Sequence, residues 1–192
     1  MPVEAFFYSV DTSALIRLKQ HYPKDLSYFL PIWDYIGRLS NEGRLFIPEE
    51  VKSECEDEVL KNMFKEYSHI IYPTAGDLTD YMIAFQDELD KARLFLVDPE
   101  STKNRADPFV VALALTIERR NLKDLKKDAA ATCHVISYET ITNFLKLSEK
   151  DRNLIKKNTR ISIPDACSIF NIDHIDWPEF IRRENFSGPA VG

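Results

Sequence analysis

The chain has no long hydrophobic run. None of its apolar stretches approaches the roughly 20 residues that a transmembrane helix needs. Its first residues, MPVEAFFYSVDT, also lack the basic segment that precedes the apolar part of a secretion signal. These absences predict a cytoplasmic protein with no membrane partner.

Cysteine and histidine are few and scattered. The cysteines form no CxxC pair, and no histidine lies near them at the spacing of zinc ligands, so the sequence supports neither a zinc site nor a cysteine–histidine nucleophile. We expect the cysteines to be buried thiols and the histidines to be surface or packing residues. The residues concerned are Cys55, Cys133 and Cys167, and His21, His69, His134 and His174.

The remaining composition is that of an ordinary globular domain. Of the 192 residues, 44% are hydrophobic and 29% are charged, which suffices for one well-filled core. No internal repeat, low-complexity tract or linker divides the chain. Residues 1–192 are therefore predicted to form a single domain.

The net charge of −6 is unevenly distributed. Residues 1–100 carry 10 basic and 19 acidic side chains, a net of −9, whereas residues 101–192 carry 15 basic and 12 acidic ones, a net of +3. The basic excess lies in KLSEKDRNLIKKNTR, residues 146–160. Either a solvated helix face or contact with an RNA backbone accounts for such a run. The candidate RNA-binding residues are Lys146, Lys150, Lys156 and Lys157.

Short apolar runs alternate with helical patterns along the chain. Helices are predicted at 13–22, from Asp25 to a stop at Gly43, at 48–67, at 76–96, around the apolar run 109–117, and after Glu139 and Asp165. Buried strands are predicted at 6–10, 45–47, 133–137 and 161–163, and 69–73 is either a strand or a linker. This alternation indicates parallel strands in a layered α/β fold.

Acidic residues recur where these elements begin or end. They are Asp11 after the first strand, Glu49, Glu50 and Glu54 in the helix after the second, Asp107 at the start of the buried helix, Glu139 after strand 133–137, and Asp165 after 161–163. Residues just past the carboxyl ends of parallel strands gather along one edge of the sheet. We therefore expect these carboxylates to converge.

Converging carboxylates need compensation. Two of them about 4 Å apart repel by about 4 kcal/mol at an effective dielectric of 20, a large part of a stability of about 5–15 kcal/mol. Raised pKa values compensate in part, and hard cations such as Mg²⁺ or Mn²⁺ do so more completely. A pair of such ions activates water against a phosphodiester without a serine, cysteine or histidine nucleophile. Most of these acids also have a simpler interpretation as helix-start chemistry: Asp11 as an N-cap, Glu54 near a helix start, and Asp107 and Asp165 beside prolines.

The motifs DTSALI, IPEEVKSE, ADPFVVALAL and VISYE, in this order, resemble those of the PIN-domain nucleases, and ISIPDAC resembles a compact PIN-like subfamily of unknown function. The resemblance covers about residues 5–175. It implies a three-layer α/β/α sandwich with a central, mainly parallel sheet, and a metal-dependent ribonuclease site.

The resemblance also implies roles for particular residues. The metal-binding and catalytic acids are Asp11, Glu54, Asp107 and Glu139, with Thr12, Ser13 and Ser137 in support. Asp165 is a further candidate metal ligand from the recurring acid pattern, not from the resemblance. Glu139 replaces an aspartate that is usual in the family, and Glu49 or Glu50 could take the place of Glu54. Arg105, just before the buried helix, is a candidate contact for the scissile phosphate, or else an exposed loop residue.

Many small PIN-like proteins are toxins of toxin–antitoxin pairs, so the resemblance implies an RNA substrate, a cognate antitoxin and a homodimer. Of two other interpretations, the sequence argues against the first and leaves the second open. A phosphatase that starts from a D-x-D motif would need an acid at position 13, where this chain has Ser13. A PIN-like scaffold that binds protein or RNA without cutting agrees with the net negative charge.

Overall fold

The computed structural model describes residues 6–67, 71–72, 75–97, 106–124, 132–142 and 159–186. A five-stranded sheet in the order β3-β2-β1-β5-β7 forms its centre, and every adjacent pair of strands is parallel. The strands are β1 (Phe6–Val10), β2 (Leu45–Pro48), β3 (Ile71–Tyr72), β5 (Thr132–Ile136) and β7 (Asp173–Ile175).

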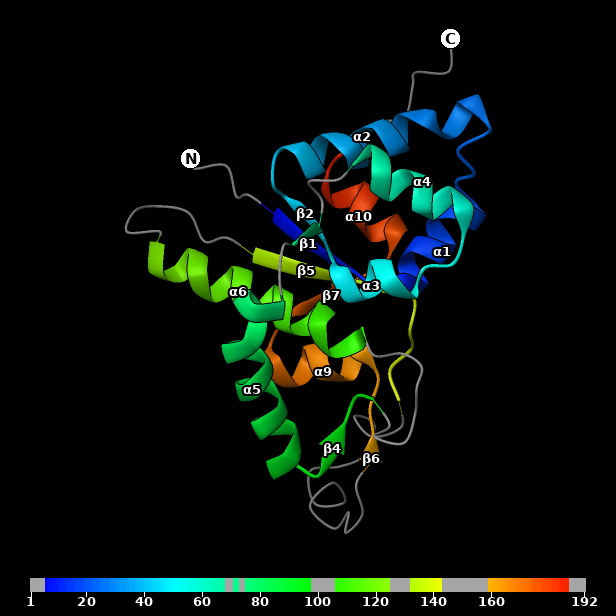
Figure 1. Ribbon diagram of the computed structural model, residues 1–192. Helices are drawn as coiled ribbons and strands as arrows, with labels where there is room; N and C mark the ends of the chain where they lie inside the picture. The colour runs from blue at the N-terminus through cyan, green and yellow to red at the C-terminus, as the bar shows by residue number, and fades with distance from the viewer. Residues whose placement is uncertain are drawn as a thin grey trace.

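Helices cover both faces of this sheet, so the fold is the predicted three-layer α/β/α sandwich (Figure 1). On one side lie α1 (Thr12–His21), α2 (Leu30–Asn41), α4 (Glu58–Glu66) and α10 (Trp177–Arg183), and a short 3-10 turn (Ser27–Phe29) precedes α2. On the other side lie α5 (Ala75–Lys91), α6 (Asp107–Asp124) and α9 (Ile163–Phe170).

The central strand β1 is buried on both faces, as its apolar sequence predicts. Successive side chains of a strand point to opposite faces. Tyr8 therefore meets α10, where its ring lies 4.9 Å from that of Phe180 in an edge-on contact. Ser9 faces the other layer and donates a 2.8 Å hydrogen bond to the carbonyl oxygen of Val110 in α6. Parallel sheets covered by helices on both sides require such strands.

The single helix predicted over residues 48–67 is wrong, because the chain forms two helices there, α3 (Glu49–Glu54) and α4. The break is stabilised by Asp57, whose carboxylate accepts hydrogen bonds from the amides of Val59 (2.9 Å) and Leu60 (3.3 Å) and so caps α4. Asp57 also pairs with Lys19 of α1. The stop predicted at Gly43 is confirmed: α2 ends at Asn41, and Gly43 has a φ of +67°.

A second, two-stranded sheet replaces two predicted elements. The helix predicted over 76–96 ends at Lys91, and β4 (Leu94–Phe95) follows it. β4 pairs in parallel with β6 (Thr159–Arg160). The strand predicted at 161–163 is therefore wrong, since pairing stops at Arg160 and Ile163 already begins α9.

Two elements near the C-terminal end, β7 and α10, are additions to the prediction. β7 extends the sheet beyond β5, and α10 places the fully buried Trp177 and Phe180 against the core. The helix predicted after Glu139 lies outside the described residues from residue 143 onwards. The three cysteines are buried free thiols, as expected. In the described part of the chain, each helix is either too short or too polar to cross a membrane.

The packing of α2 against the end of α4 depends on a glycine. A Cβ atom added at Gly37 would lie 2.6 Å from Cε1 and 2.9 Å from Cζ of the Tyr67 ring. We expect Gly37→Ala to lower the free energy of unfolding by about 1–3 kcal/mol, because overpacking forces neighbouring atoms to shift. Urea denaturation measures this change, and the double variant with Tyr67→Leu should recover much of the loss. Unchanged stability in Gly37→Ala would show that the ring moves aside freely.

Candidate active site

Two neighbouring strands bring distant parts of the chain to one edge of the sheet. The strand order reverses at β1 and β5, because the chain adds β2 and β3 on one side of β1 and β5 and β7 on the other. Val10 is paired with Ile136, so both strands end at the same level, and the amide of Asp11 donates a 3.0 Å hydrogen bond to the Ile136 carbonyl oxygen. Open α/β sheets bind ligands at such a reversal point.

Asp11 is the first acidic side chain at this edge. It is 3% exposed and caps α1, since Oδ2 accepts hydrogen bonds from the amide (2.9 Å) and the hydroxyl (2.5 Å) of Ser13. The Ser13 hydroxyl also accepts a 3.0 Å hydrogen bond from the amide of Tyr138, which joins the ends of β1 and β5. Burial raises the pKa of Asp11 to about 6, and the charge of Glu139 adds to this while the Ser13 hydrogen bonds oppose it. Asp11 is thus both a helix cap and an acid at the sheet edge.

Glu54, at the end of α3, links three elements. Its Oε1 accepts a 3.0 Å hydrogen bond from the amide of Ala106, and its Oε2 accepts a 3.4 Å hydrogen bond from the hydroxyl of Thr12. These contacts position the start of α6 next to the start of α1. Glu54 is also the member of its acidic stretch whose charge affects Asp107, whereas the more exposed Glu49 pairs with Lys52 of the same helix.

Asp107 is the first residue of α6 and is 6% exposed. Its pKa is raised to about 8, mainly by burial and then by the negative charges of Asp11, Glu139 and Glu54. Arg160 acts in the opposite direction. Among the described residues, no group donates a hydrogen bond to this carboxylate. Within the described residues, Asp107 is therefore a buried acid without a compensating donor.

Glu139 follows β5 after Ser137 and Tyr138. It is half-buried, and its Oε2 accepts a 2.7 Å hydrogen bond from the amide of Ile163 at the start of α9. Its charge raises the pKa of both Asp11 and Asp107. The structure thus brings Asp11, Glu54, Asp107 and Glu139 into one electrostatically coupled group, which we call the carboxylate cluster.

Two residues predicted for the site have other partners. Asp165 forms a capping box with Ser162 and also accepts hydrogen bonds from the amide of Thr142 at 3.1 and 3.2 Å. Burial opposes ionisation of Asp165, but these hydrogen bonds outweigh it and lower its pKa. β6 is not a strand of the main sheet, so Asp165 does not follow a strand of that sheet, and its capping box agrees with the helix-start interpretation. The hydroxyl of Ser137 lies 2.9 Å from Nε2 of His174 on β7.

The donor chemistry of the cluster fits Mg²⁺ or Mn²⁺, since every candidate ligand is a carboxylate oxygen and Asp107 has no competing donor among the described residues. As the side chains stand in the described ranges, no three acidic, histidine or cysteine residues lie close enough to hold one ion. Glu54 and Glu139 bond to backbone amides instead. Three carboxylates would have to move together to share a metal.

The predicted RNA-binding residues Arg105, Lys146, Lys150, Lys156 and Lys157 lie outside the described residues. The structure adds Arg160, the last residue of the same basic run, whose charge reaches Asp107. The basic run could have identified Arg160 from the sequence as a candidate RNA contact. Its position near Asp107, however, depends on the pairing of β6 with β4.

Comparison with known proteins identifies a family. No curated protein and no solved structure is significantly similar to this chain. One family model, described as Domain of unknown function (DUF4411), matches residues 8–123. The match includes Asp11, Glu54 and Asp107 and spans more than half of the chain, whereas Glu139 lies beyond it. The chain therefore belongs to the DUF4411 family.

Proposed function

We propose that this protein is a PIN-like, metal-dependent endoribonuclease that hydrolyses RNA phosphodiester bonds with Mg²⁺ or Mn²⁺. One observation carries the proposal: four carboxylates from separate segments influence one another electrostatically near the reversal point of a parallel sheet, and one of them is a buried acid with a pKa of about 8. Strongly perturbed acids that converge in this way are typical of functional sites. The resemblance of the motifs to PIN domains supports the choice of RNA as substrate.

The residues of the cluster have distinct tasks in this proposal. Asp107 and Asp11 would be the principal metal ligands, with Glu54 and Glu139 completing the set. When bound, the metal would supply water activation and stabilise the charge that develops on the phosphate. Ser13 orients Asp11, and Glu54 holds the start of α6 and with it Asp107. Near neutral pH without metal, Asp107 holds a proton and so limits repulsion within the cluster.

Metal binding should depend on pH, and this tests the site. Asp107 must lose its proton to bind a cation, so affinity should rise as the pH approaches its pKa of about 8 and then level off. We expect the affinity for Mn²⁺ to increase about 20-fold from pH 6.5 to 8.0, with Asp11 contributing little over that range. Calorimetry measures the affinity, and the rise in Tm on adding Mn²⁺ should follow it.

Asp34→Asn, which removes an exposed acid of α2, is the matched control and should bind Mn²⁺ as the unmodified chain does. Two results would contradict binding at the cluster: an affinity for Mn²⁺ that is equal at both pH values, or a lower affinity in Asp34→Asn than in the unmodified chain.

The second candidate is a PIN-like module that binds protein or RNA without cutting it. Two observations favour it: Glu54 and Glu139 are already hydrogen-bonded to backbone amides, and no three metal-binding side chains in the described residues are close enough to share an ion. The absence of Mn²⁺ stabilisation, with the fold intact, would support the module.

The biological role that we propose is that of a toxin in a toxin–antitoxin pair, with a cognate antitoxin and a homodimer as partners. This part of the proposal rests on the PIN-like motifs alone. A small reading frame next to the gene, whose product relieves growth arrest caused by this protein, would support it.

A further inference from the structure

The β4–β6 pair lies beside the carboxylate cluster and presents two side chains together. Phe95 is the register partner of Arg160. The pairing is held by hydrogen bonds from the amide of Thr159 to the Arg93 carbonyl oxygen (3.0 Å) and from the amide of Ile161 to the Phe95 carbonyl oxygen (2.9 Å). Paired residues of adjacent parallel strands point to the same face of a sheet, so the aromatic ring and the guanidinium are neighbours.

Arg160 is a cation at the edge of an acidic site. It is exposed and lines a hollow of about 470 Å³ together with Tyr138, Glu139, Thr142 and other residues. Within the described ranges it forms no ion pair, although its charge lowers the pKa of Asp107 and so acts on the cluster. A guanidinium that is not neutralised by a neighbouring carboxylate can bind a phosphate through two parallel hydrogen bonds.

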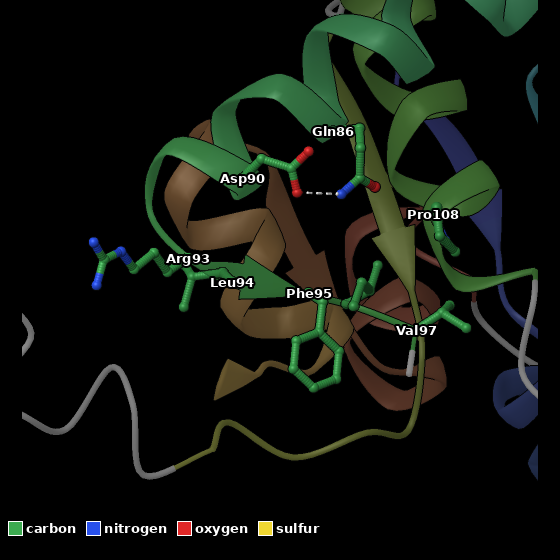
Figure 2. Close-up of a pocket in the computed structure, with 8 residues that line it drawn as sticks. Gln86, Asp90, Arg93, Leu94, Phe95, Val97 and Pro108 are labelled. Atoms are coloured by element: carbon green, nitrogen blue, oxygen red, sulfur yellow. Dashed lines mark hydrogen bonds between the residues drawn. The ribbon is translucent and has the colours of Figure 1, made fainter. Parts of the chain in front are cut away.

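Phe95 lines a second hollow, of about 500 Å³, which also contains Pro108, the residue after Asp107. Figure 2 shows its ring projecting from β4 away from Gln86 and Asp90, which are hydrogen-bonded to each other on α5. The ring is half-buried, and among the described residues it is not part of the packed core. A partly exposed ring of this kind offers a face on which a base can stack.

We propose that Phe95 and Arg160 form a subsite for one nucleotide of single-stranded RNA, with Arg160 binding a phosphate that flanks the scissile one and Phe95 stacking on the base. β4 lines one hollow and β6 lines the other, so the paired strands lie between them. The first hollow includes Pro108, which follows Asp107, and the second includes Glu139. A single strand can place a phosphate and an unpaired base there together, whereas the bases of a duplex are already stacked. The inference rests on the proposed nuclease function, but the binding does not require cleavage.

The salt dependence of binding separates the two contacts. We would measure the anisotropy of a fluorescein-labelled single-stranded RNA with the full chain in EDTA, from about 50 to 200 mM salt. Arg160→Ala should raise Kd about 10-fold and reduce the slope of log Kd against log salt by about 0.7, the value for one phosphate contact on a single strand. Phe95→Ala should also raise Kd about 10-fold but leave the slope unchanged.

Two further variants act as controls. Arg160→Lys keeps the charge and should preserve the slope. Arg38→Ala removes an exposed arginine near the end of α2. This end of α2 leads into the start of β2, so Arg38 lies towards the amino edge of the sheet, opposite to the edge that carries the carboxylate cluster. This variant should change neither Kd nor the slope. Thermal unfolding of each variant verifies that the fold is intact.

Equal Kd and slope in Arg160→Ala and the unmodified chain would overturn the subsite, even if the protein cleaves RNA. Duplex RNA that binds as tightly as the single strand would overturn it as well. If the protein cuts no RNA but the variants show the predicted changes in Kd and slope, the subsite would be supported and the nuclease proposal contradicted.

Discussion

Asp107→Asn should abolish the proposed RNA cleavage and at the same time make the metal-free protein more stable. Cleavage should fall by at least about 10²- to 10³-fold, the loss typical of removing one group that stabilises charge in a transition state. Stability should change in the opposite direction, because the asparagine removes a buried carboxylate that Asp11, Glu139 and Glu54 repel. Active sites commonly carry such a conflict between stability and function.

The stability effect has a defined pH dependence. The pKa of Asp107 is about 8 in the folded protein and near 3.8 when unperturbed, so between these values the folded state holds a proton that the unfolded state has lost. The contribution of this group to stability is therefore fully present below about pH 4 and is lost as the pH rises towards 8. In EDTA we expect the free energy of unfolding of Asp107→Asn to exceed that of the unmodified chain by about 2–4 kcal/mol at pH 8.5 and by much less at pH 5.

Urea unfolding at the two pH values measures this difference, with Asp34→Asn as the control that should show none. Adding Mn²⁺ should stabilise the unmodified chain but not Asp107→Asn. Growth arrest on expression, if the protein is a toxin, should also disappear in Asp107→Asn. A variant that is less stable at pH 8.5, or that still cuts RNA, would contradict the assignment of Asp107.

Glu184→Ala should destabilise the protein by about 3–5 kcal/mol, the cost of breaking a buried ion pair. The Glu184 side chain is 6% exposed, and its oxygens accept hydrogen bonds from the hydroxyls of Tyr8 (2.6 Å) and Tyr35 and from Nη2 of Arg44 (2.5 Å). Burial, and then the bond to Glu184, raise the pKa of Tyr35 to about 12 and that of Tyr8 still further. One carboxylate thus joins the end of α10 to β1, α2 and the start of β2.

Two variants calibrate this result. Glu184→Gln keeps an acceptor oxygen and should cost about 1–3 kcal/mol. Glu42→Ala removes a second carboxylate beside Arg44. The Glu42 side chain is 45% exposed and its Oε2 lies 3.5 Å from Nη1 of Arg44, so its loss should lower the free energy of unfolding by less than about 1 kcal/mol. Urea denaturation of the three variants provides the comparison. Similar losses for Glu184→Ala and Glu42→Ala would show that Glu184 is effectively solvated.

The proposed metal binding and catalysis should survive Glu184→Ala in the folded fraction. Its partners Tyr8 and Arg44 belong to the middle of β1 and the segment before β2, whereas the carboxylate cluster lies at the carboxyl edge of the sheet. The two largest expected effects are therefore separable, one at the proposed site and the other in the framework.

The residues that could be located from the sequence are those whose signal is local. Residues 6–10 form a buried strand because their apolar pattern suits a sheet covered on both faces, and Asp11 follows as a helix cap at the strand's end. Gly43 ends a helix because it accepts a positive φ. Alternation of strands and helices was enough to predict parallel strands in a layered α/β fold, since each such unit has few ways to pack, and the resemblance to PIN domains added the three-layer arrangement.

Other features depend on partners that are far away in the chain. β6 pairs with a strand more than sixty residues earlier, so the pattern around Ile161 could not show where pairing stops, or that the strand before Asp165 lies outside the main sheet. Ser137 stands at the predicted position, yet its hydroxyl meets His174 on a strand that was not predicted. Arg160 acts on Asp107 through the same unforeseen pairing. Neighbouring residues determine local backbone preference, so the sequence alone predicts it. The direction of a side chain and the charges around it depend on long-range packing, which cannot be read from a single sequence.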